Sequence, residues 1–297
     1  MSVRAANSPA SWGIEPPEPV TDPPWTRVLD EIAGAGYPGT ELGPIGYLPR
    51  DPDRLVGALH ARRLSLAAGF VMAPLAAGAA AAETAAVTRE TCRLLRAGRS
   101  STLILIDAVN PERAATAGRS DDARRLDVAA WSRLTDTVRR VAEIASGEYS
   151  LRVSFHPHVG TDVEFEDEVE RLLQDITAGE LGLCPDTGHL TYAGMDPLAM
   201  LRRHRDRVGY LHLKDIDEER LARVRAERRS FGAAVAGGIF RPLGDGCVDF
   251  AGLRAVLGEL GYEDWITVEQ DRLPESSTTP RAEARRSLEF LARIGIA

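Results

Sequence analysis

The sequence of 297 residues predicts a single-domain α/β protein folded as a (β/α)₈ TIM barrel, with a long insertion after the seventh strand. Short β-branched segments alternate with helical segments about eight times, which is typical of a parallel sheet. Eight such units in about 250–300 residues fit a closed barrel better than an open sheet. No glycine-rich dinucleotide fingerprint follows the first predicted strand, and its absence argues against a Rossmann fold.

The predicted strands are short and mostly apolar, and they cover Val3–Ala6, Gly39–Leu42, Leu64–Val71, Thr102–Asp107, Tyr149–His156, Leu181–Pro185, Val208–Leu213 and Trp265–Gln270. The predicted helices cover Pro24–Ala35, Asp53–Arg62, Ala80–Ala97, Ala129–Ser146, Glu166–Leu173, Pro197–Arg203, Phe250–Leu260 and Pro280–Ile294. Helix starts are marked by Asp196 and Asp249, which stand directly before two of these helices. Gly36 and Gly261 mark helix ends that lead into strands.

One segment, residues 217–245, interrupts the alternation between the seventh strand and its returning helix. Glu218–Arg229 is charged and helix-prone, Phe231–Phe240 is small, apolar and glycine-rich, and Pro242–Gly246 is a turn. Insertions of this length are usually functional or disordered. At the carboxyl end of a barrel we expect a lid over the site, with a surface insertion as the alternative. The predicted domain is therefore one barrel over residues 1–297 that includes this lid.

Composition excludes several classes of protein. The net charge of −8 argues against nucleic-acid binding, whose phosphates require a basic surface. Three widely spaced cysteines fit a reducing cytoplasm, and the start of the chain has no signal-peptide pattern. We therefore expect a cytoplasmic protein with a small-molecule partner, no nucleic acid and no membrane. A homodimer is one candidate for its oligomeric state.

Four residues that can hold a divalent metal lie at the ends of the last four predicted strands: His156, Asp186, His212 and Glu269. Because the carboxyl ends of barrel strands converge on one site, these side chains are expected to surround one point. Two imidazoles and two carboxylates suit Mn²⁺, Co²⁺, Fe²⁺ or Zn²⁺, and suit Ca²⁺ less well. Each residue alone has a structural explanation, and Asp186 in particular could cap a helix. Four such residues at consecutive strand ends favour a metal site.

Other polar residues near these strand ends are candidate substrate contacts: Asn7, Trp12, Glu41, His158, His189 and Lys214. His158, His189 and Lys214 are also candidate catalytic groups, together with Glu269. Lys214 is the only lysine among 36 basic residues, and it follows a predicted metal ligand by two positions. For Glu41 a buried hydrogen-bonding role is an equal alternative, and Trp12 could equally be plain packing.

Three motifs carry a family resemblance: Asp186-Thr187-Gly188-His189-Leu190, His212-Leu213-Lys214-Asp215 and Val268-Glu269-Gln270-Asp271. They resemble the xylose isomerase-like sugar phosphate isomerase/epimerase superfamily, and within it the inosose dehydratases (2-keto-myo-inositol dehydratases). The resemblance covers most of the chain from Trp25 onward. It implies a barrel, a divalent metal (Mn²⁺ or Co²⁺, with Mg²⁺, Fe²⁺ or Zn²⁺ as alternatives) and a polyhydroxylated ketone substrate. It also implies metal ligands at Asp186, His212 and Glu269, with His156 at the fourth position.

The fourth ligand position separates two branches of the superfamily. Ketose epimerases place a glutamate there, so that two metal-bound carboxylates exchange a proton across the substrate. Here the residue is His156, and only Glu269 remains as a glutamate ligand. This asymmetry favours a metal-dependent lyase that dehydrates a cyclic ketone such as 2-keto-myo-inositol through a metal-stabilised enediolate. A ketose or cyclitol epimerase or isomerase on the same barrel is the alternative.

The hypothesised mechanism assigns proton removal to Glu269 or a nearby histidine, and assisted loss of the β-hydroxyl to His158, His189 or Lys214. The metal is expected to lower the pKa of Lys214. Two further alternatives are a metal-dependent abasic-site nuclease, which the net charge of −8 disfavours, and a non-catalytic sugar-binding relative.

Overall fold

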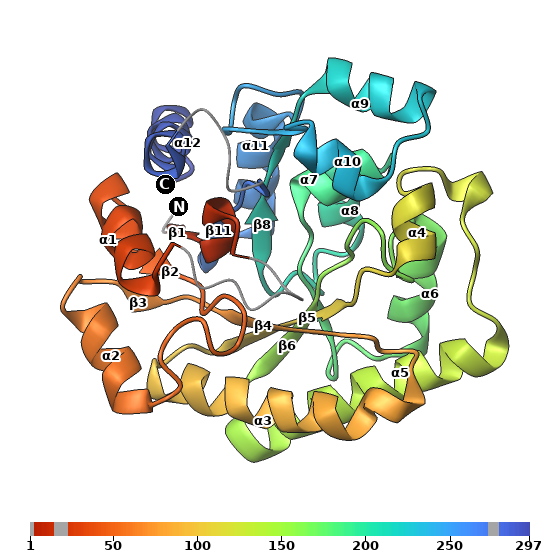
Figure 1. Cartoon of the computed structure of the whole chain (residues 1–297), viewed down its shortest axis with the longest axis horizontal. Helices are drawn as coiled ribbons and strands as arrows, with labels where there is room; N and C mark the ends of the chain where they lie inside the picture. Colours follow the sequence, from red (N-terminus) through yellow and green to blue (C-terminus); the bar gives the residue numbers. More distant parts are fainter. Residues whose placement is uncertain (1–2, 15–22, 273–278) are drawn as a thin grey trace.

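The structure is a computed structural model that describes residues 3–14, 23–272 and 279–297, and it confirms the predicted barrel (Figure 1). One run of hydrogen-bonded strands joins β3 (Ser65–Leu66), β2 (Gly39–Thr40), β1 (Arg4–Asn7), β11 (Trp265–Val268) and β8 (Leu211–Leu213). The other run joins β4 (Gly69–Ala73), β5 (Thr102–Asp107), β6 (Arg152–Phe155) and β7 (Gly182–Leu183). All of these pairs are parallel.

The two runs close into one ring. Parallel bridges Leu183–Val208 and Asp186–His212 connect the end of one run to β8. At the other junction, β3 and β4 are consecutive pieces of the third barrel strand, separated by Ala67 and Ala68. Strand neighbours therefore follow chain order around the barrel, which places the carboxyl ends of the last four strands side by side.

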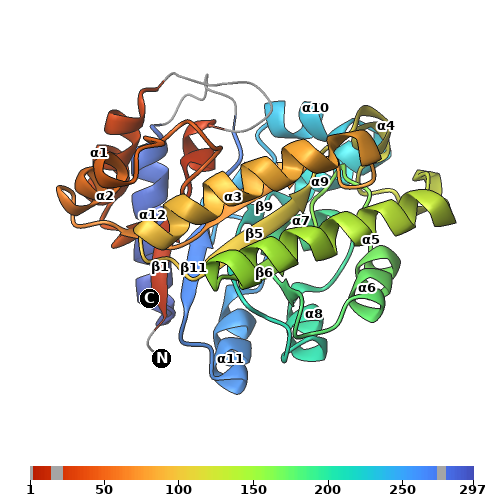
Figure 2. The ribbon, with the colours of Figure 1, turned by 90° about the horizontal axis from the view of Figure 1, so that it is seen from below.

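The predicted helices form the outer layer (Figure 2). They are α1 (Trp25–Ala35), α2 (Pro52–His60), α3 (Ala81–Ala97), α5 (Val128–Glu143), α6 (Glu166–Asp175), α8 (Pro197–Arg203), α11 (Phe250–Leu260) and α12 (Pro280–Ile294). The Asp196 carboxylate accepts from Leu198 N–H at the start of α8, and the Asp249 carboxylate accepts from Gly252 N–H at the start of α11. None of the helices in the described ranges is both long enough and apolar enough to cross a bilayer.

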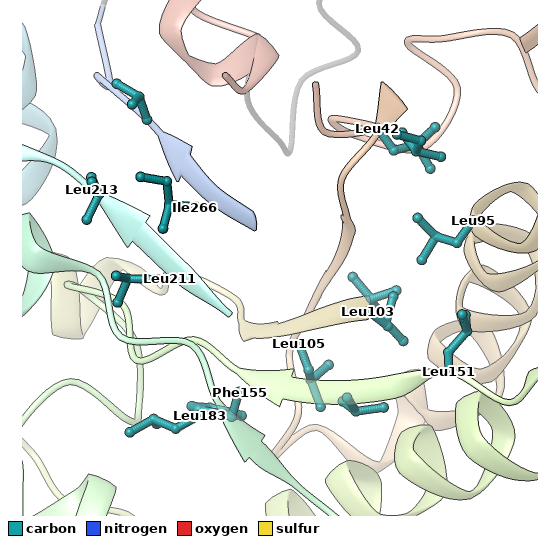
Figure 3. Packing of buried hydrophobic residues seen from close by; sticks show 14 of the residues in the cluster. Leu42, Leu95, Leu103, Leu105, Leu151, Phe155, Leu183, Leu211, Leu213 and Ile266 are labelled. Atoms are coloured by element: carbon teal, nitrogen blue, oxygen red, sulfur yellow. The ribbon is translucent and has the colours of Figure 1, made fainter. Parts of the chain in front are cut away.

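Alternation along the strands decides which residues face the barrel interior. Leu211 and Leu213 of β8 belong to the large apolar cluster between strands and helices, as do Leu103 and Leu105 of β5 (Figure 3). His212, between the two leucines, therefore points into the barrel. The same rule turns the residues at positions 156, 269 and 271 inward, because Phe155 and Val268 before them face outward.

Several elements differ from the prediction. Two short helices, α4 (Pro111–Thr116) and α7 (Thr187–Tyr192), follow strands directly, and each is too short to show a helical period in the sequence. The helix predicted to end at Ser146 finishes in a π-helical turn at Ile144–Glu148, so β6 begins three residues later than predicted.

The insertion after β8 is ordered and folded onto the barrel end. β9 (Asp215–Ile216) pairs antiparallel with β10 (Phe240–Arg241), and between them lie α9 (Glu218–Ala226) and α10 (Phe231–Ala236). Its apolar residues form a small core of their own with residues of the barrel end: Ala117, Val159, Tyr192, Ile216, Leu221, Val224, Phe231, Ala234, Ile239 and Phe240. In Figure 1, α10 of this segment lies next to α4.

One buried carboxylate ties the insertion to the barrel. Asp215 accepts hydrogen bonds from the backbone N–H groups of Ile216 at 2.9 Å, Gly244 at 2.9 Å, Gly246 at 2.9 Å and Val248 at 3.1 Å. Both ends of the insertion are therefore held by a single side chain. A side chain at position 246 would collide with this carboxylate, which accounts for the glycine there.

We predict that Asp215→Asn loosens the insertion, because the new amide would turn a donor toward backbone N–H groups that now need an acceptor. The expected loss is about 1–3 kcal/mol of local stability. Native-state hydrogen exchange should show faster exchange at Gly244, Gly246 and Val248. Asp249→Asn is the matched control, since asparagine caps a helix as well as aspartate does. Unchanged protection at the three amides would contradict this role for Asp215.

Candidate metal centre

The four predicted ligands come together at the carboxyl end of the barrel. His156 follows β6, Asp186 follows β7, His212 lies within β8 and Glu269 follows β11. All four side chains are buried, and each offers a ligand atom within 4.8 Å of the other three. Barrel closure therefore brings together residues that are up to 113 positions apart in the sequence.

The distances between these atoms fit one shared ion. His212 Nδ1 lies 3.3 Å from Glu269 Oε2 and 3.9 Å from Asp186 Oδ2, and His156 Nε2 lies 4.0 Å from Asp186 Oδ2. With metal–ligand bonds of about 2.0–2.2 Å, two ligands of one ion can lie at most about 4.4 Å apart. All three separations are below that limit.

Buried polar atoms without partners supply an independent test of the fit. Asp186 Oδ1 accepts from the N–H groups of Gly188 at 2.8 Å and His189 at 2.9 Å, which caps α7. Asp186 Oδ2 has no hydrogen-bond partner among the described residues, and neither do His156 Nδ1 and His212 Nδ1. Asp186 Oδ2 and His212 Nδ1 lie 3.9 Å apart; burying such atoms without partners is costly, and a cation between them would remove that cost. The nitrogen that His156 brings closest to Asp186 is Nε2, at 4.0 Å from Oδ2. Asp186 therefore combines the capping role with a second oxygen that faces the other candidate ligands.

Glu41 contacts one of the predicted ligands, His212. It is buried after β2, and His212 Nε2 lies 2.9 Å from its Oε1. A proton on Nε2 donates to this carboxylate and leaves the lone pair on Nδ1, the atom that faces Asp186 and Glu269. This is the buried hydrogen-bonding role that the sequence left open for Glu41. Contact between Glu41 and substrate stays a prediction.

A second polar cluster adjoins the first. His158, His189 and Asp271 also offer ligand atoms within 4.8 Å of one another. Lys214 Nζ lies 2.6 Å from Asp271 Oδ1, 3.0 Å from His189 Nε2 and 3.4 Å from Glu269 Oε2. The single lysine thus connects the two clusters. Asp271 had no assigned role, although its position two residues after an inward-facing ligand placed it on the same face of the strand.

Burial controls the charge of the histidines. It is the largest cause that holds the pKa of His156 and of His189 well below the ordinary value, and it lowers the pKa of His158 to about 3. Nearby positive groups act in the same direction, including Lys214. These three imidazoles are therefore neutral near pH 7, and a neutral ring is the form that binds a metal.

Nearby carboxylates favour the charged forms of two other basic groups in the site, Lys214 and His212. Burial lowers the pKa of Lys214, but Asp186, Asp271 and Glu269 outweigh it and raise that pKa above its ordinary value. For His212, burial is again outweighed, chiefly by Glu269, and the pKa lies well above 6.5. The protein groups alone thus raise the pKa of Lys214, whereas a bound metal ion is expected to lower it.

A cavity of about 570 Å³ opens beside the clusters. Its polar lining residues are His156, His158, His212, Lys214, Glu269 and Asp271. The insertion contributes Phe231, Gly232 and Val235 from α10, and the Phe231 ring lies 5.7 Å from that of His158. The segment predicted as a lid therefore forms one wall of the cavity. Another cavity, of about 530 Å³, lies where the strands begin, and its lining includes Arg4 and Trp265 but none of the predicted ligands.

Besides Glu41, three other predicted substrate contacts lie outside the residues that line the cavity. Trp12 packs in the main apolar core, and its Nε1–H donates to Glu31 Oε2 at 2.6 Å. Asn7 is buried at the end of β1. His189 lies behind the wall, with its ring 3.9 Å from that of His158. Their roles toward substrate stay predictions.

Comparisons with known proteins agree with this architecture. A family model described as xylose isomerase-like TIM barrel matches residues 29–294. The rhizopine catabolism protein MocC of Rhizobium meliloti is 34% identical over 309 aligned positions, which cover 100% of this chain and 90% of that protein. Inosose dehydratase of Geobacillus kaustophilus (strain HTA426) is 32% identical, over 90% of this chain and 86% of that enzyme.

A solved structure shows the same fold at lower sequence identity. The crystal structure of the IOLI protein with a bound zinc atom superposes with a TM-score of 0.73 at 13% identity, and the match covers 98% of this chain and 97% of that one.

We predict that Glu41→Gln lowers the affinity for Mn²⁺ by about 10- to 100-fold, the usual effect of losing a carboxylate that orients a histidine ligand. The glutamine can donate to His212 Nε2, which would move the ring proton to Nδ1 and block the lone pair. Calorimetric titration of the chelator-treated protein with Mn²⁺ measures the change. Glu31→Gln, at the carboxylate that pairs with Trp12, is the control. Equal affinity in Glu41→Gln and wild type would exclude the orienting role.

Proposed function

The chain belongs to the xylose isomerase-like TIM barrel family and is an enzyme, and from this premise we propose that it is a metal-dependent hydro-lyase acting on a polyhydroxylated cyclic ketone such as 2-keto-myo-inositol. The observation that carries the proposal is the buried cluster of His156, Asp186, His212 and Glu269, in which Asp186 Oδ2 and His212 Nδ1 lie 3.9 Å apart with no hydrogen-bond partner among the described residues. The inosose dehydratase of Geobacillus kaustophilus, which matches 90% of the chain, supports the dehydration of a sugar-like ring.

His156, Asp186, His212 and Glu269 would hold the ion, and Mn²⁺ or Co²⁺ suits this mixture of nitrogen and oxygen ligands, with Mg²⁺, Fe²⁺ or Zn²⁺ as alternatives. When bound, a divalent ion supplies Lewis-acid stabilisation for the negative charge that develops on the ketone oxygen. The protein's part is to orient the substrate, move two protons and exclude water.

Glu269 is our candidate for removing the proton from the carbon next to the ketone. It lines the cavity, and in the protein without metal the charges of His212 and Lys214 outweigh burial and hold the pKa of Glu269 well below its ordinary value. With an ion at His212 Nδ1, Lys214 at 3.4 Å would still favour the carboxylate form. Loss of this proton gives an enediolate, and loss of the β-hydroxyl then forms a carbon–carbon double bond. The product is the enol of a 1,2-diketone, and tautomerisation gives the diketone.

Lys214 is our candidate for protonating the departing hydroxyl. Of the three groups considered from the sequence, Lys214 and His158 line the cavity. His158 is a neutral ring and a weak acid, whereas Lys214 is an ammonium held by Asp271 at 2.6 Å. Its position 3.4 Å from Glu269 places the base and the acid on the same side of the substrate, as removal of water from one face requires.

The wall opposite these groups disfavours epimerisation. An epimerase removes a proton from one face of the substrate and returns it to the other, so it needs an acid–base group on each side. The lining residues from β4 and β5, which lie across the ring of strands from β8 and β11, are Phe70, Met72 and Ile106. No acid–base side chain lines that wall in the described part of the chain, which agrees with the sequence argument from His156.

The insertion at residues 217–245 would exclude water from the enediolate, because Phe231 and Val235 of α10 cover the cavity beside His158. We also propose a cytoplasmic location and a small polyol or ketose as the partner, with no role for nucleic acid. The net charge of −8 supports the last point.

We predict that Mn²⁺-loaded protein converts 2-keto-myo-inositol to a product lighter by one water, with a new ultraviolet absorbance from the diketone. Mass spectrometry distinguishes this result from epimerisation, in which mass is conserved. Treatment with a chelator should abolish turnover, and Mn²⁺ or Co²⁺ should restore it. An epimerised ketone of unchanged mass would replace the lyase proposal with the epimerase, and full activity after chelation would remove the metal from the mechanism.

We predict that Glu269→Gln abolishes measurable turnover without unfolding the protein. Lys214→Met should lower kcat by about 10²- to 10⁴-fold, the usual contribution of a general acid, while Mn²⁺ still binds. Lys214→Arg should not restore the rate, because a guanidinium does not release its proton. Single-turnover kinetics together with thermal unfolding measure both effects. His158→Gln is the comparison: a larger loss of kcat in that variant than in Lys214→Met would move the acid role to the histidine.

A further inference from the structure

The candidate substrate cavity has two chemically different halves. Its polar residues follow β6, β8 and β11 or lie within them, and all belong to the two buried clusters. The other half is formed by β4, β5, the loop after β5, and α10 of the insertion. Its side chains are apolar and include Phe70, Met72, Ile106, Val109, Phe231 and Val235.

The apolar half is built into the barrel core. Phe70 and Met72 of β4 pack against the inner apolar cluster that contains Ile104 and Ile106 of β5. Alternation along both strands turns these residues to the interior. At the rim, Val109 is 40% exposed, one of the few large apolar side chains that the described residues leave open to solvent. Apolar surface thus continues from the cavity floor to its mouth.

This wall is poorly suited to a ring that carries hydroxyl groups in every direction. A hydroxyl moved from water to an apolar surface loses its hydrogen bonds, and no polar side chain of the described lining stands on this side to replace them. A cavity of about 570 Å³ also lies within the range of about 300–1,000 Å³ that accommodates drug-sized ligands. It therefore has room for a substituent beyond a single ring.

We propose that the natural substrate is a cyclic polyol ketone that carries an apolar substituent, an alkyl or aryl ether, which occupies the wall formed by Phe70, Met72, Ile106 and Val109. The inference rests on the proposed function, because the metal cluster fixes which end of the molecule is the ketone. The polar half then recognises the ketone and its neighbouring hydroxyls, and the apolar half selects the substituent.

Binding of unreactive analogues tests the proposal without turnover. The Mn²⁺-loaded protein is titrated calorimetrically with myo-inositol and with each mono-O-propyl myo-inositol. We expect at least one propyl ether to bind about tenfold tighter than myo-inositol or better, since each buried methylene contributes roughly fourfold in affinity. If every propyl ether binds as weakly as myo-inositol, or more weakly, the proposal is overturned.

A matched pair of variants locates the substituent. Val109→Ser changes the rim of the apolar wall, and Val128→Ser makes the same chemical change on α5 at a side chain that is 80% exposed and not part of the cavity. In the wild type, the dissociation constant of the propyl ether divided by that of myo-inositol should be well below one. This ratio should rise several-fold toward one in Val109→Ser and stay unchanged in Val128→Ser. An equal ratio in both variants would place the substituent elsewhere and reject the wall as its site.

The outcome is separable from that of the proposed function. Dehydration of 2-keto-myo-inositol without any preference for alkyl ethers would keep the lyase and reject the apolar substituent. Tight binding of an ether, but no loss of water from its ketone, would keep the apolar subsite and reject the lyase.

Discussion

Charge compensation inside the barrel is the constraint on which the site depends. Asp186, Glu269 and Asp271 are buried around one amine, Lys214, at 3.6, 3.4 and 2.6 Å from its Nζ. One ammonium cannot neutralise three carboxylates, and an uncompensated buried charge is costly. In the protein alone the imbalance favours proton uptake: burial and the neighbouring acids raise the pKa of Asp271 to about 6, despite the opposing effect of Lys214. The carboxylates, chiefly Glu269, outweigh burial and raise the pKa of His212 well above its ordinary value. A divalent cation would supply the two missing positive charges without protonating a ligand, which explains why the lysine and the metal ligands form one network.

The regular geometry of the barrel allows the members of this network to be predicted from the sequence. Because strand neighbours follow chain order and side chains alternate, a polar residue that continues the inward face of a strand is directed to a common centre. His156, His212 and Glu269 satisfy that rule, and Asp186 satisfies it at the start of α7. The clustering of the four candidate ligands, the eight barrel strands and the eight helices of the outer layer could therefore be predicted from residue type and spacing. The position of the insertion could also be predicted, because residues 217–245 interrupt the alternation between a barrel strand and the helix that follows it.

Other features depend on contacts between segments that spacing does not relate. Glu41 was ambiguous because its partner, His212, lies 171 positions away and becomes a neighbour only when β2 and β8 enclose the same interior. Asp271 was overlooked because its role comes from Lys214. The helices α4 and α7 were missed because six residues cannot show a helical period, and α7 is buried on nearly all sides, so that no polar face marks it. Residue type and spacing predicted which residues cluster, but the partners that contact them could be identified only from the fold.

The division of the cavity bears on how such an enzyme could change its substrate. The residues that would hold the ion and move protons stand after β6, β7 and β11 or within β8, whereas the apolar wall comes from β4, β5 and the insertion. Substitutions at Val109 or Val235 would alter the shape of the wall without touching a ligand, a proton-transfer group or a partner that orients them. The two halves contact the substrate at different places, so their contributions to transition-state binding are nearly independent. Substitutions in the apolar wall can therefore change substrate specificity while the charge balance around Lys214 stays intact. The buried charge network tolerates substitution less well than the wall, because a change at one group leaves other buried charges uncompensated.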